Sequence, residues 1–244
     1  MRHFGLIGYP LGHSFSKGFF TEKFQREGIA AVYENYPLES ITELPALLQN
    51  NPGIEGLNVT IPYKEQVIPY LDEVSPVVQE IGACNCIRIV NGKLIGHNTD
   101  VTGFEKSFSR KLKPGHYPAL VLGTGGASKA VQYVLRLLGI PFSVVSRNAN
   151  PGQGILSYEG LSHELQAESL VWINTTPLGM KPDLGTRPPM QYSMLSRDHY
   201  LYDLVYNPPC TRFLSEGLER GAVIENGHDM LEIQALESWK IWNR

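Results

Sequence analysis

A glycine-rich segment in the middle of the chain contains the residue types that bind a pyrophosphate. It runs from Gly123 to Ser128, directly after the apolar run 119–122 and directly before a helical pattern. Gly123 and Gly125 allow a tight turn in which backbone N–H groups can approach an anion, and the following helix presents its positive N-terminal end to the same anion. A strand, a turn and a helix in this order predict a dinucleotide site.

Two residues in the first hundred positions could carry a proton. Lys64 ends the segment Asn58 to Lys64, and Asp100 ends the triplet Asn98 to Asp100. Each also has an ordinary structural interpretation: Lys64 as a solvated lysine in the first turn of a helix that begins at Pro62, and Asp100 as the N-cap of the next helix. Lysine is disfavoured near the positive end of a helix, so this position favours a chemical role for Lys64.

The elements that must position these residues alternate between strands and helices, which predicts parallel sheets with helical crossovers. In the first hundred residues the expected strands are 4–7, 32–36 and 54–59, and the expected helices are 15–27, 41–48 and one that begins at Pro62. The pair Asn91-Gly92 between the segments 86–90 and 93–95 predicts an antiparallel hairpin. Gly28 is expected to close helix 15–27, with Phe19, Phe20 and Phe24 on its buried side.

The second half of the chain repeats this alternation around the glycine-rich segment. A helix is expected after Asp100 that ends near Leu112, followed by a linker at 113–116. The expected strands are 119–122, 142–146, 170–174, 201–205 and 222–225. The clearest helix is 126–138, with an apolar face made of Ala127, Ala130, Val131, Val134, Leu137 and Leu138. Residues 148–160 are rich in Gly, Pro and Asn and are expected to lack a full helix, and a last helix is expected at 229–242.

Composition narrows the class of protein. The chain has 244 residues, of which 42% are apolar and 18% charged, and this excludes a disordered chain. A net charge of −3 without a basic run gives no reason to expect nucleic acid. No apolar stretch is long enough to predict a membrane span or a secretory signal, so we expect a cytoplasmic protein. Three cysteines and seven scattered histidines predict neither a disulfide framework nor a metal site.

Eight short motifs, in order and in register over essentially the whole chain, resemble those of the shikimate dehydrogenase family. The motifs are Gly8–Ser16, Asn58–Lys64, Gly82–Asn85, Asn98–Asp100, Gly123–Ala127, Asn174–Met180, Asp203–Pro208 and Gly227–Gln234. A lone glycine fingerprint is a weak pattern, whereas eight motifs in register are specific.

The resemblance implies an α/β fold with two domains, an N-terminal mostly parallel α/β substrate domain and a Rossmann-type NADP-binding domain. It places the substrate domain at 1–100, completed by the C-terminal helix 227–244, and the NADP-binding domain at 101–226. The implied reaction is the NADPH-dependent reduction of 3-dehydroshikimate to shikimate in aromatic amino-acid biosynthesis. Reduction of a ketone by hydride leaves an alkoxide that needs a proton donor, and Lys64 with Asp100 as its partner is the implied catalytic pair.

The resemblance also implies a set of substrate-binding residues. They are Ser14, Ser16, Asn58, Thr60, Asn85, Tyr206 and Gln234. Ser14 and Ser16 are two hydroxyls on the same side of an extended segment, spaced to meet a carboxylate, although either could instead cap the next helix. Asn58, Thr60, Asn85 and Gln234 have an alternative as turn or strand-end residues, and Tyr206 as a core residue. Lys17 replaces a usual proline, and its charge would suit an anionic substrate, whereas Asp229 replaces a frequent glycine.

The cofactor implied is NADP. Its expected binding residues are Gly123, Thr124, Gly125, Gly126, Ala127, Ser128, Ser146, Arg147, Asn148, Thr175, Leu204 and Gly227. An NAD site places an acid about twenty residues after the glycines, and no Asp or Glu occurs between Gly123 and Tyr158. Ser146-Arg147-Asn148 stands there instead. The family commonly adds a second basic residue a few positions later, which this chain lacks, so Arg147 alone is expected to stack on the adenine and to pair with the 2′-phosphate.

Other functions remain open at this stage. A quinate/shikimate dehydrogenase that uses NAD is disfavoured by the absence of an acid near 146–148. A methylene-tetrahydrofolate dehydrogenase has no use for Ser14 and Ser16. A nucleotide-binding regulatory module without catalysis is disfavoured by the intact Lys64 and Asp100. The expected partner is the small-molecule substrate alone, shikimate or 3-dehydroshikimate, with neither nucleic acid nor membrane, in a monomer or a homodimer.

Overall fold

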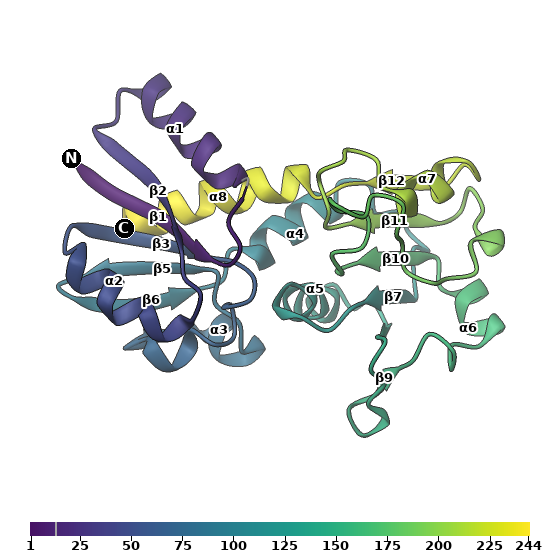
Figure 1. The fold of residues 1–244 in the computed structure, drawn as a ribbon. Coiled ribbons are helices and arrows are strands. Elements are labelled where there is room, and N and C mark those ends of the chain that lie inside the picture. Colours follow the sequence, from purple (N-terminus) through teal and green to yellow (C-terminus); the bar gives the residue numbers. More distant parts are fainter. Residues whose placement is uncertain (13) are drawn as a thin grey trace. The chain divides into compact units, whose positions relative to one another are not determined.

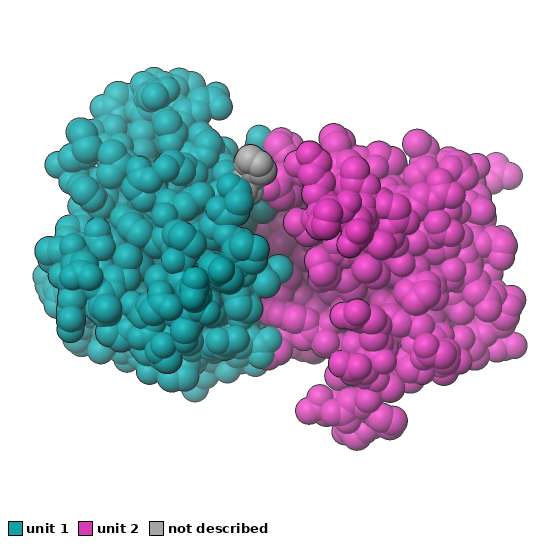
Figure 2. Space-filling view, viewed as in Figure 1, with its two compact units in different colours: residues 1–102, 231–244 teal, residues 103–230 magenta. Residues whose placement is uncertain are grey.

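A computed structural model describes residues 1–12 and 14–244, so His13 of the first motif lies outside the described residues. The chain divides into two compact units (Figure 2). Unit 1 consists of residues 1–102 and 231–244, and unit 2 of residues 103–230. Among the described residues, no helix combines the length and the apolar character needed to cross a membrane.

Unit 1 contains a six-stranded sheet in the order β2-β1-β3-β5-β6-β4. Its strands are β1 (Arg2–Gly8), β2 (Ala31–Pro37), β3 (Ile54–Val59), β4 (Glu73–Val74), β5 (Cys86–Val90) and β6 (Lys93–His97). Strand β1 is parallel to β2 and β3, while β5 is antiparallel to both of its neighbours. The predicted hairpin is confirmed: Val90 pairs with Lys93, and Asn91 and Gly92 have the positive φ angles of 51° and 78° that this tight turn requires.

Helices cover both faces of the sheet of unit 1 (Figure 1). Helix α1 (Phe15–Glu27) and α8 (His228–Trp242) contribute to one apolar cluster, and α2 (Leu44–Asn50) and α3 (Pro76–Ile81) to the other. Side chains alternate between the faces because successive strand residues point to opposite sides. On β1, Phe4 and Leu6 therefore pack in the first cluster and Ile7 in the second. A short 3-10 helix, η1 (Ile41–Glu43), precedes α2.

Unit 2 contains a six-stranded sheet in which every neighbouring pair is parallel. Its strands are β7 (Ala119–Leu122), β8 (Phe142–Val145), β9 (Ile155–Leu156), β10 (Val171–Asn174), β11 (Tyr200–Asp203) and β12 (Val223–Glu225). The spatial order β12-β11-β10-β7-β8-β9, counted from β7, is 3-2-1-4-5-6 from one edge, the order of Rossmann folds. The predicted α/β class with a Rossmann-type unit is confirmed.

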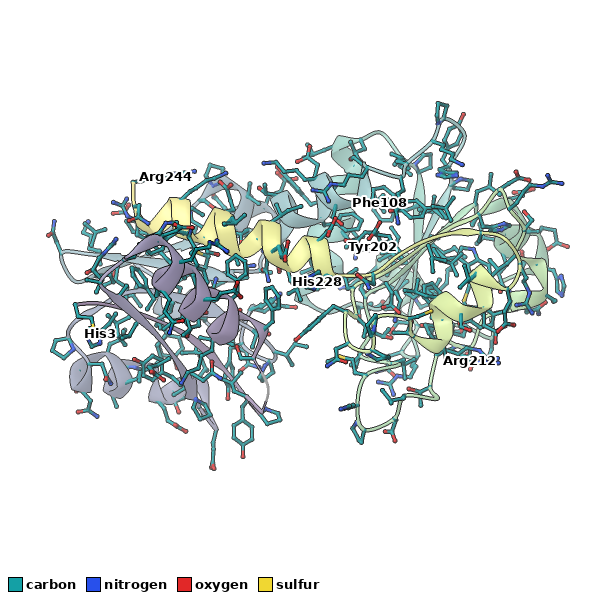
Figure 3. All side chains as sticks on the ribbon, turned by 90° about the horizontal axis from the view of Figure 1, so that it is seen from above. His3, Phe108, Tyr202, Arg212, His228 and Arg244 are labelled. Atoms are coloured by element: carbon teal, nitrogen blue, oxygen red, sulfur yellow. The ribbon has the colours of Figure 1, made fainter. Side chains whose placement is uncertain are left out.

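The helices of unit 2 pack on this sheet through apolar side chains. They are α5 (Gly126–Leu137), α6 (His163–Glu168) and α7 (Arg212–Leu218), with two short 3-10 helices, η3 (Pro151–Gln153) and η4 (Tyr192–Met194). Helix α4 (Asp100–Phe108) begins in unit 1, and its last residues pack on β11. Figure 3 labels Phe108 and Tyr202, whose ring centroids lie 5.9 Å apart. The expectation that residues 148–160 lack a full helix is confirmed.

One predicted helix is wrong, and it concerns the segment that carries Lys64. Residues 61–67 form turns, followed by the 3-10 helix η2 (Ile68–Tyr70), instead of a helix that begins at Pro62. Pro69 has no N–H to donate, and in a continuous helix its ring would collide with the carbonyl of Glu65. The argument from the positive end of a helix therefore does not apply to Lys64.

Two further expectations need correction, and one helix was not predicted. Helix α4 ends at Phe108, before Leu112, because Phe108 is its last buried residue and residues 109–111 are exposed. On α5, Leu137 and Leu138 are 61% and 37% exposed, and Leu135 is buried instead, because the helix ends at Leu137 and Gly139 turns the chain away with φ 66°. Helix α3 was not predicted, although Ser75 and Pro76 form a favourable N-terminus.

Candidate functional site

Lys64 and Asp100 form a buried ion pair within unit 1. Lys64 Nζ donates to Asp100 Oδ2 at 2.6 Å, and the two side chains are 16% and 3% exposed. The Lys64 carbonyl accepts from the Cys84 N–H at 2.7 Å, which fixes the turn to the start of the hairpin. Asn98 holds the other partner, because its Oδ1 accepts from the Val101 N–H at 3.2 Å at the start of α4. Burial of a charge is costly unless it is paired, so the half-buried Lys64 ammonium stabilises the buried Asp100 carboxylate in this position.

Asn85 and Gln234 are joined directly. Asn85 Nδ2 donates to Gln234 Oε1 at 2.9 Å and to Thr99 Oγ1 at 3.1 Å. Asn85 Oδ1 accepts from the Thr99 N–H at 2.7 Å, so the residue before Asp100 is fixed by the same amide. The residue before β5, the segment before α4 and the helix α8 thus meet at one buried amide.

Asn58 is hydrogen-bonded on all sides. Its Oδ1 accepts from the Tyr33 hydroxyl at 2.9 Å, and its Nδ2 donates to Ser238 Oγ at 2.9 Å and to the Asn85 carbonyl at 3.2 Å. Both N–H bonds of the amide are therefore used inside the protein. Thr60, at the end of β3, is half-buried and donates its backbone N–H to the Ile7 carbonyl at 2.9 Å.

The two serines of the first motif differ in conformation. Ser14 is extended, with φ −96° and ψ 120°, and its side chain caps α1 by accepting from the Lys17 N–H at 3.3 Å. Ser16 is the second residue of α1 and is half-buried. The expectation of one extended segment is therefore wrong for Ser16, because the helix starts at Phe15. The Lys17 charge is paired with Glu34 at 2.5 Å.

The glycine-rich segment of unit 2 lies where the strand order reverses. Strands β7 and β10 are neighbours, and Leu122 pairs with Asn174 at their carboxyl ends. Gly123 follows with φ 117°, and a Cβ placed there would lie 2.6 Å from Thr175 Oγ1. Thr175 is fixed in turn by its N–H and its hydroxyl, which both donate to the Leu122 carbonyl. Only glycine fits at 123, and the chain crosses the crevice position at which nucleotides bind in such sheets.

Gly125 is the N-cap of α5 and leaves the start of that helix open. A Cβ on Gly125 would meet nothing within 4 Å, and no side chain caps the helix. The first N–H groups of a helix without such a cap are available to an anion. Ser128 has a different place: its buried hydroxyl donates to the Gly123 carbonyl at 2.7 Å and accepts from Gln132 at 3.0 Å. The Ser128 side chain therefore stabilises the loop. Thr124 is exposed, and Gly126 and Ala127 begin α5 half-buried.

The segment Ser146-Arg147-Asn148 follows β8 at the same edge of the sheet. Arg147 and Asn148 are exposed, and the Asn148 N–H donates to Ser146 Oγ at 3.3 Å, which forms a tight turn. The positive charge of Arg147 acts on Tyr158, whose pKa burial nevertheless raises to about 12. In sequence, Arg147 precedes and Tyr158 follows the short crossover that contains η3 and β9.

The remaining predicted residues of unit 2 are Leu204 and Tyr206, which follow β11, and Gly227, which contacts the Leu204 backbone. The Leu204 N–H donates to the Asn174 carbonyl at 2.9 Å, and a Cβ on Gly227 would collide with the Leu204 carbonyl oxygen. Gly227 is therefore required by a close backbone approach. Tyr206 is half-buried, and burial raises its pKa. Asp229 forms an ion pair with Arg110, which accommodates the acid at this position.

Asp203, at the end of β11, is a residue for which the motifs predicted no individual role. It is fully buried and accepts from three neutral donors: Asn174 Nδ2 at 2.9 Å, the Val205 N–H at 3.0 Å and the Thr211 hydroxyl at 2.5 Å. Burial raises the pKa of this carboxyl to about 7, although the three hydrogen bonds lower it. Its position in a motif at a strand end was the available indication.

Unit 2 thus has the sheet order, the glycine turn and the open helix N-terminus of a dinucleotide-binding α/β protein, and unit 1 adds a buried lysine–carboxylate pair. Comparisons with known proteins agree with this class. The family model of the shikimate dehydrogenase substrate binding domain matches residues 6–87. The NADP(+) shikimate dehydrogenase of Caldanaerobacter subterraneus subsp. tengcongensis is 34% identical over 98% of this chain and 90% of its own length.

Solved structures are similar over nearly the whole chain. The shikimate 5-dehydrogenase of Thermus thermophilus, in complex with NADP(H) and shikimate, has a TM-score of 0.87 and 31% identity over 99% of this chain and 93% of its own. The quinate dehydrogenase of Corynebacterium glutamicum, in complex with NAD, has a TM-score of 0.87 and 28% identity, with the same coverage. The chain belongs to the shikimate dehydrogenase family, as its motifs predicted.

Proposed function

We propose that this protein reduces 3-dehydroshikimate to shikimate with NADPH, in a reversible reaction of aromatic amino-acid biosynthesis. The observation that carries the proposal is the buried pair Lys64–Asp100 in a member of this family. Relatives with the name shikimate dehydrogenase (NADP(+)) support it over nearly their full length.

The residues of unit 2 fit NADP. Gly123 and Gly125 leave room for a pyrophosphate beside the open start of α5, which is twelve residues long. When bound, NADPH supplies the hydride. Arg147 can pair with a 2′-phosphate, and the segment 123–158 contains no acid that would repel this phosphate. Ser146, Asn148, Thr175, Leu204 and Gly227 would line the rest of this edge.

The residues of unit 1 would hold the substrate and move the proton. Lys64 would donate a proton to the oxygen of the reduced carbonyl group, and Asp100 would orient the ammonium and accept from a substrate hydroxyl. Asn85 and Gln234 would hydrogen-bond to the ring hydroxyls. Ser14 and Ser16 would hold the carboxylate, and Thr60 would add a further contact to the ring hydroxyls. Tyr206 stays a prediction from the family resemblance.

This assignment gives each unit one role. Unit 1 would be the substrate domain, in agreement with the family model that matches residues 6–87, and unit 2 the NADP-binding domain. We place the enzyme in the cytoplasm as a monomer or a homodimer, where its three free cysteines would stay reduced.

A quinate dehydrogenase with NAD is the second candidate, because such an enzyme is among the similar structures. The assay that separates the candidates mixes purified protein with NADPH and 3-dehydroshikimate and follows the loss of reduced-nicotinamide absorbance. The reverse direction uses shikimate or quinate with NADP or NAD. We expect the highest kcat/KM for shikimate with NADP. Preference for quinate with NAD would support the second candidate, and no turnover with any pair would leave a nucleotide-binding module.

A further inference from the structure

Three buried residues that the proposed function does not use connect the candidate substrate residues of unit 1. They are Tyr33 on β2, Thr99 before α4 and Ser238 on α8, and their exposed fractions are 2%, 0% and 0%. Ser238 Oγ accepts from Asn58 Nδ2 at 2.9 Å and donates to the Gln234 carbonyl at 2.9 Å. A continuous line of hydrogen bonds therefore runs from Tyr33, through Asn58 and Ser238, to the Gln234 carbonyl of α8.

Tyr33 is the fixed end of this line. Its ring stacks on Phe20, with centroids 4.7 Å apart and planes at 15°, and it also contacts Trp242 at 6.3 Å. Burial raises its pKa well above the ordinary value, so the hydroxyl keeps its proton and remains a donor. That donor reaches Asn58 Oδ1 at 2.9 Å.

Asn58 has little capacity left for a ligand. Both of its N–H bonds go to protein acceptors, and its oxygen already accepts from Tyr33. An amide with this set of bonds is suited to hold its neighbours in place. Through its bond to the Asn85 carbonyl it fixes the backbone of Asn85, directly before β5, from which the Asn85 side chain reaches Gln234.

We infer that Tyr33 is a positioning residue for the substrate, acting through Asn58 on Asn85 and Gln234. This inference rests on the proposed function, because the Asn85–Gln234 pair contacts the substrate only if the substrate is shikimate. Tyr33 makes no recorded contact with Lys64 or Asp100. Its loss should therefore weaken substrate binding and leave the proton transfer step nearly unchanged.

The test is Tyr33→Phe in the full-length protein, which keeps the stacked ring and removes only the hydroxyl. The matched control is Tyr192→Phe, because the buried Tyr192 hydroxyl also makes a hydrogen bond, to the Pro188 carbonyl at 2.7 Å, in the core of unit 2. We expect KM for shikimate to rise about tenfold in Tyr33→Phe, the effect of one lost buried hydrogen bond. The value of kcat and KM for NADP should change less than about threefold. Tyr192→Phe should lower the melting temperature without raising KM for shikimate.

A double variant shows whether Tyr33 acts through Gln234. If it does, adding Tyr33→Phe to Gln234→Ala should raise KM by less than the product of the two single effects. Multiplied effects, or a rise in KM no larger than in Tyr192→Phe, would overturn the inference. If Tyr33→Phe does not fold, Ser238→Ala interrupts the same line of bonds and must raise KM for shikimate, and an unchanged KM would equally overturn it.

Calorimetric titration of wild-type protein with shikimate separates this inference from the proposed function. A wild-type protein that neither binds nor oxidises shikimate contradicts the proposed function, and the inference falls with it. A wild-type protein that does both, with a Tyr33→Phe variant that binds shikimate equally well, contradicts only the role of Tyr33.

Discussion

The two units prepare for their ligands in different ways. In unit 1 the candidate residues are side chains that already bond to one another, as in Lys64–Asp100 and Asn85–Gln234. In unit 2 the candidate cofactor-binding segment offers mostly backbone groups. Gly123 and Gly125 precede α5, and no side chain caps that helix. A polyhydroxylated ring needs donors and acceptors at fixed positions, whereas a pyrophosphate needs backbone N–H groups and space.

The two units also differ in the hydrogen bonds that stabilise each candidate site. The bonds of unit 1 join residues far apart in sequence, with Asn58 and Ser238 separated by 180 positions and Asn85 and Gln234 by 149. In unit 2, Ser128 fixes the glycine turn from only five positions away. A substitution in unit 1 should therefore act through neighbours on other elements, and one in unit 2 through local backbone contacts.

The largest effect is expected in unit 1. Lys64→Ala should lower kcat by about a hundredfold to ten-thousandfold, because a positioned proton donor contributes that much. NADP binding should stay near the wild-type value, since the glycine turn belongs to unit 2. Steady-state kinetics and fluorescence titration with NADPH measure the two quantities.

The matched control is Lys93→Ala, because Lys93 is an exposed lysine of unit 1 that pairs with Glu73 at 3.1 Å. It should keep wild-type turnover. A Lys64→Ala variant with near-native kcat would remove the assigned role. Loss of NADPH binding instead would mean that Lys64 serves the cofactor.

The same contrast explains which features the sequence could predict. The glycine turn, strand β7 and helix α5 are contiguous, so their chemistry and their structure are visible in one short segment. Asn58 hydrogen-bonds to Tyr33 and Ser238, which lie on other elements. No local sequence pattern marks these two partners. Lys64 and Asp100 were found through the family resemblance, whereas the helix expected at Pro62 was wrong because Pro69 interrupts it. Leu137 was misplaced because a helix end rotates its last residues away from the core.

Each unit contains a buried aspartate, and the two aspartates differ in the charge of their partners. Asp100 is paired with Lys64, whereas the recorded donors to Asp203 are all neutral. The pKa of Asp203 is raised to about 7, above the unfolded value of about 4, so the native state binds more protons between these pH values. Its contribution to stability is therefore full below about pH 4 and is lost as pH rises to about 7, at no more than ~1.4 kcal/mol per pH unit.

Asp203→Asn keeps an amide oxygen for the Val205 N–H and removes the titration. The free energy of unfolding of the variant, measured by urea denaturation from pH 4 to 8, should vary less with pH than that of the wild type. A parallel pH dependence in the two proteins would show that Asp203 titrates near its ordinary value.

Arg147→Ala tests the cofactor edge of unit 2. A charge-assisted bond to phosphate is worth roughly 1.5–3 kcal/mol, so NADP should bind about ten- to a hundredfold more weakly, with little change for NAD. Adding Ser146→Asp should reverse the preference, because the new carboxylate repels the phosphate and accepts from the ribose hydroxyl. The ratio of kcat/KM with NADP and NAD at fixed shikimate is the measurement.

Arg136→Ala is the control for this prediction, since Arg136 lies in the last turn of α5, at the end away from the glycine turn. It should leave the cofactor ratio unchanged. A ratio that survives Arg147→Ala would assign the 2′-phosphate to another group, with Lys129 at the start of α5 as the first to test.

The smallest effect is expected at Ser14, whose hydroxyl caps a helix and is also a proposed substrate contact. Its hydroxyl caps α1 through the Lys17 N–H at 3.3 Å, and we propose that it also meets the substrate carboxylate. Ser75 caps α3 in the same way, accepting from the Val78 N–H at 3.4 Å, and has no proposed ligand. Ser14→Ala and Ser75→Ala should each lower the free energy of unfolding by about 1 kcal/mol. Only Ser14→Ala should also raise KM for shikimate, by about three- to tenfold, and it should leave unchanged the binding of an analogue that lacks the carboxylate. Equal losses for shikimate and the analogue would mean that Ser14 acts on the helix alone, and would leave Ser16 as the proposed contact to the carboxylate.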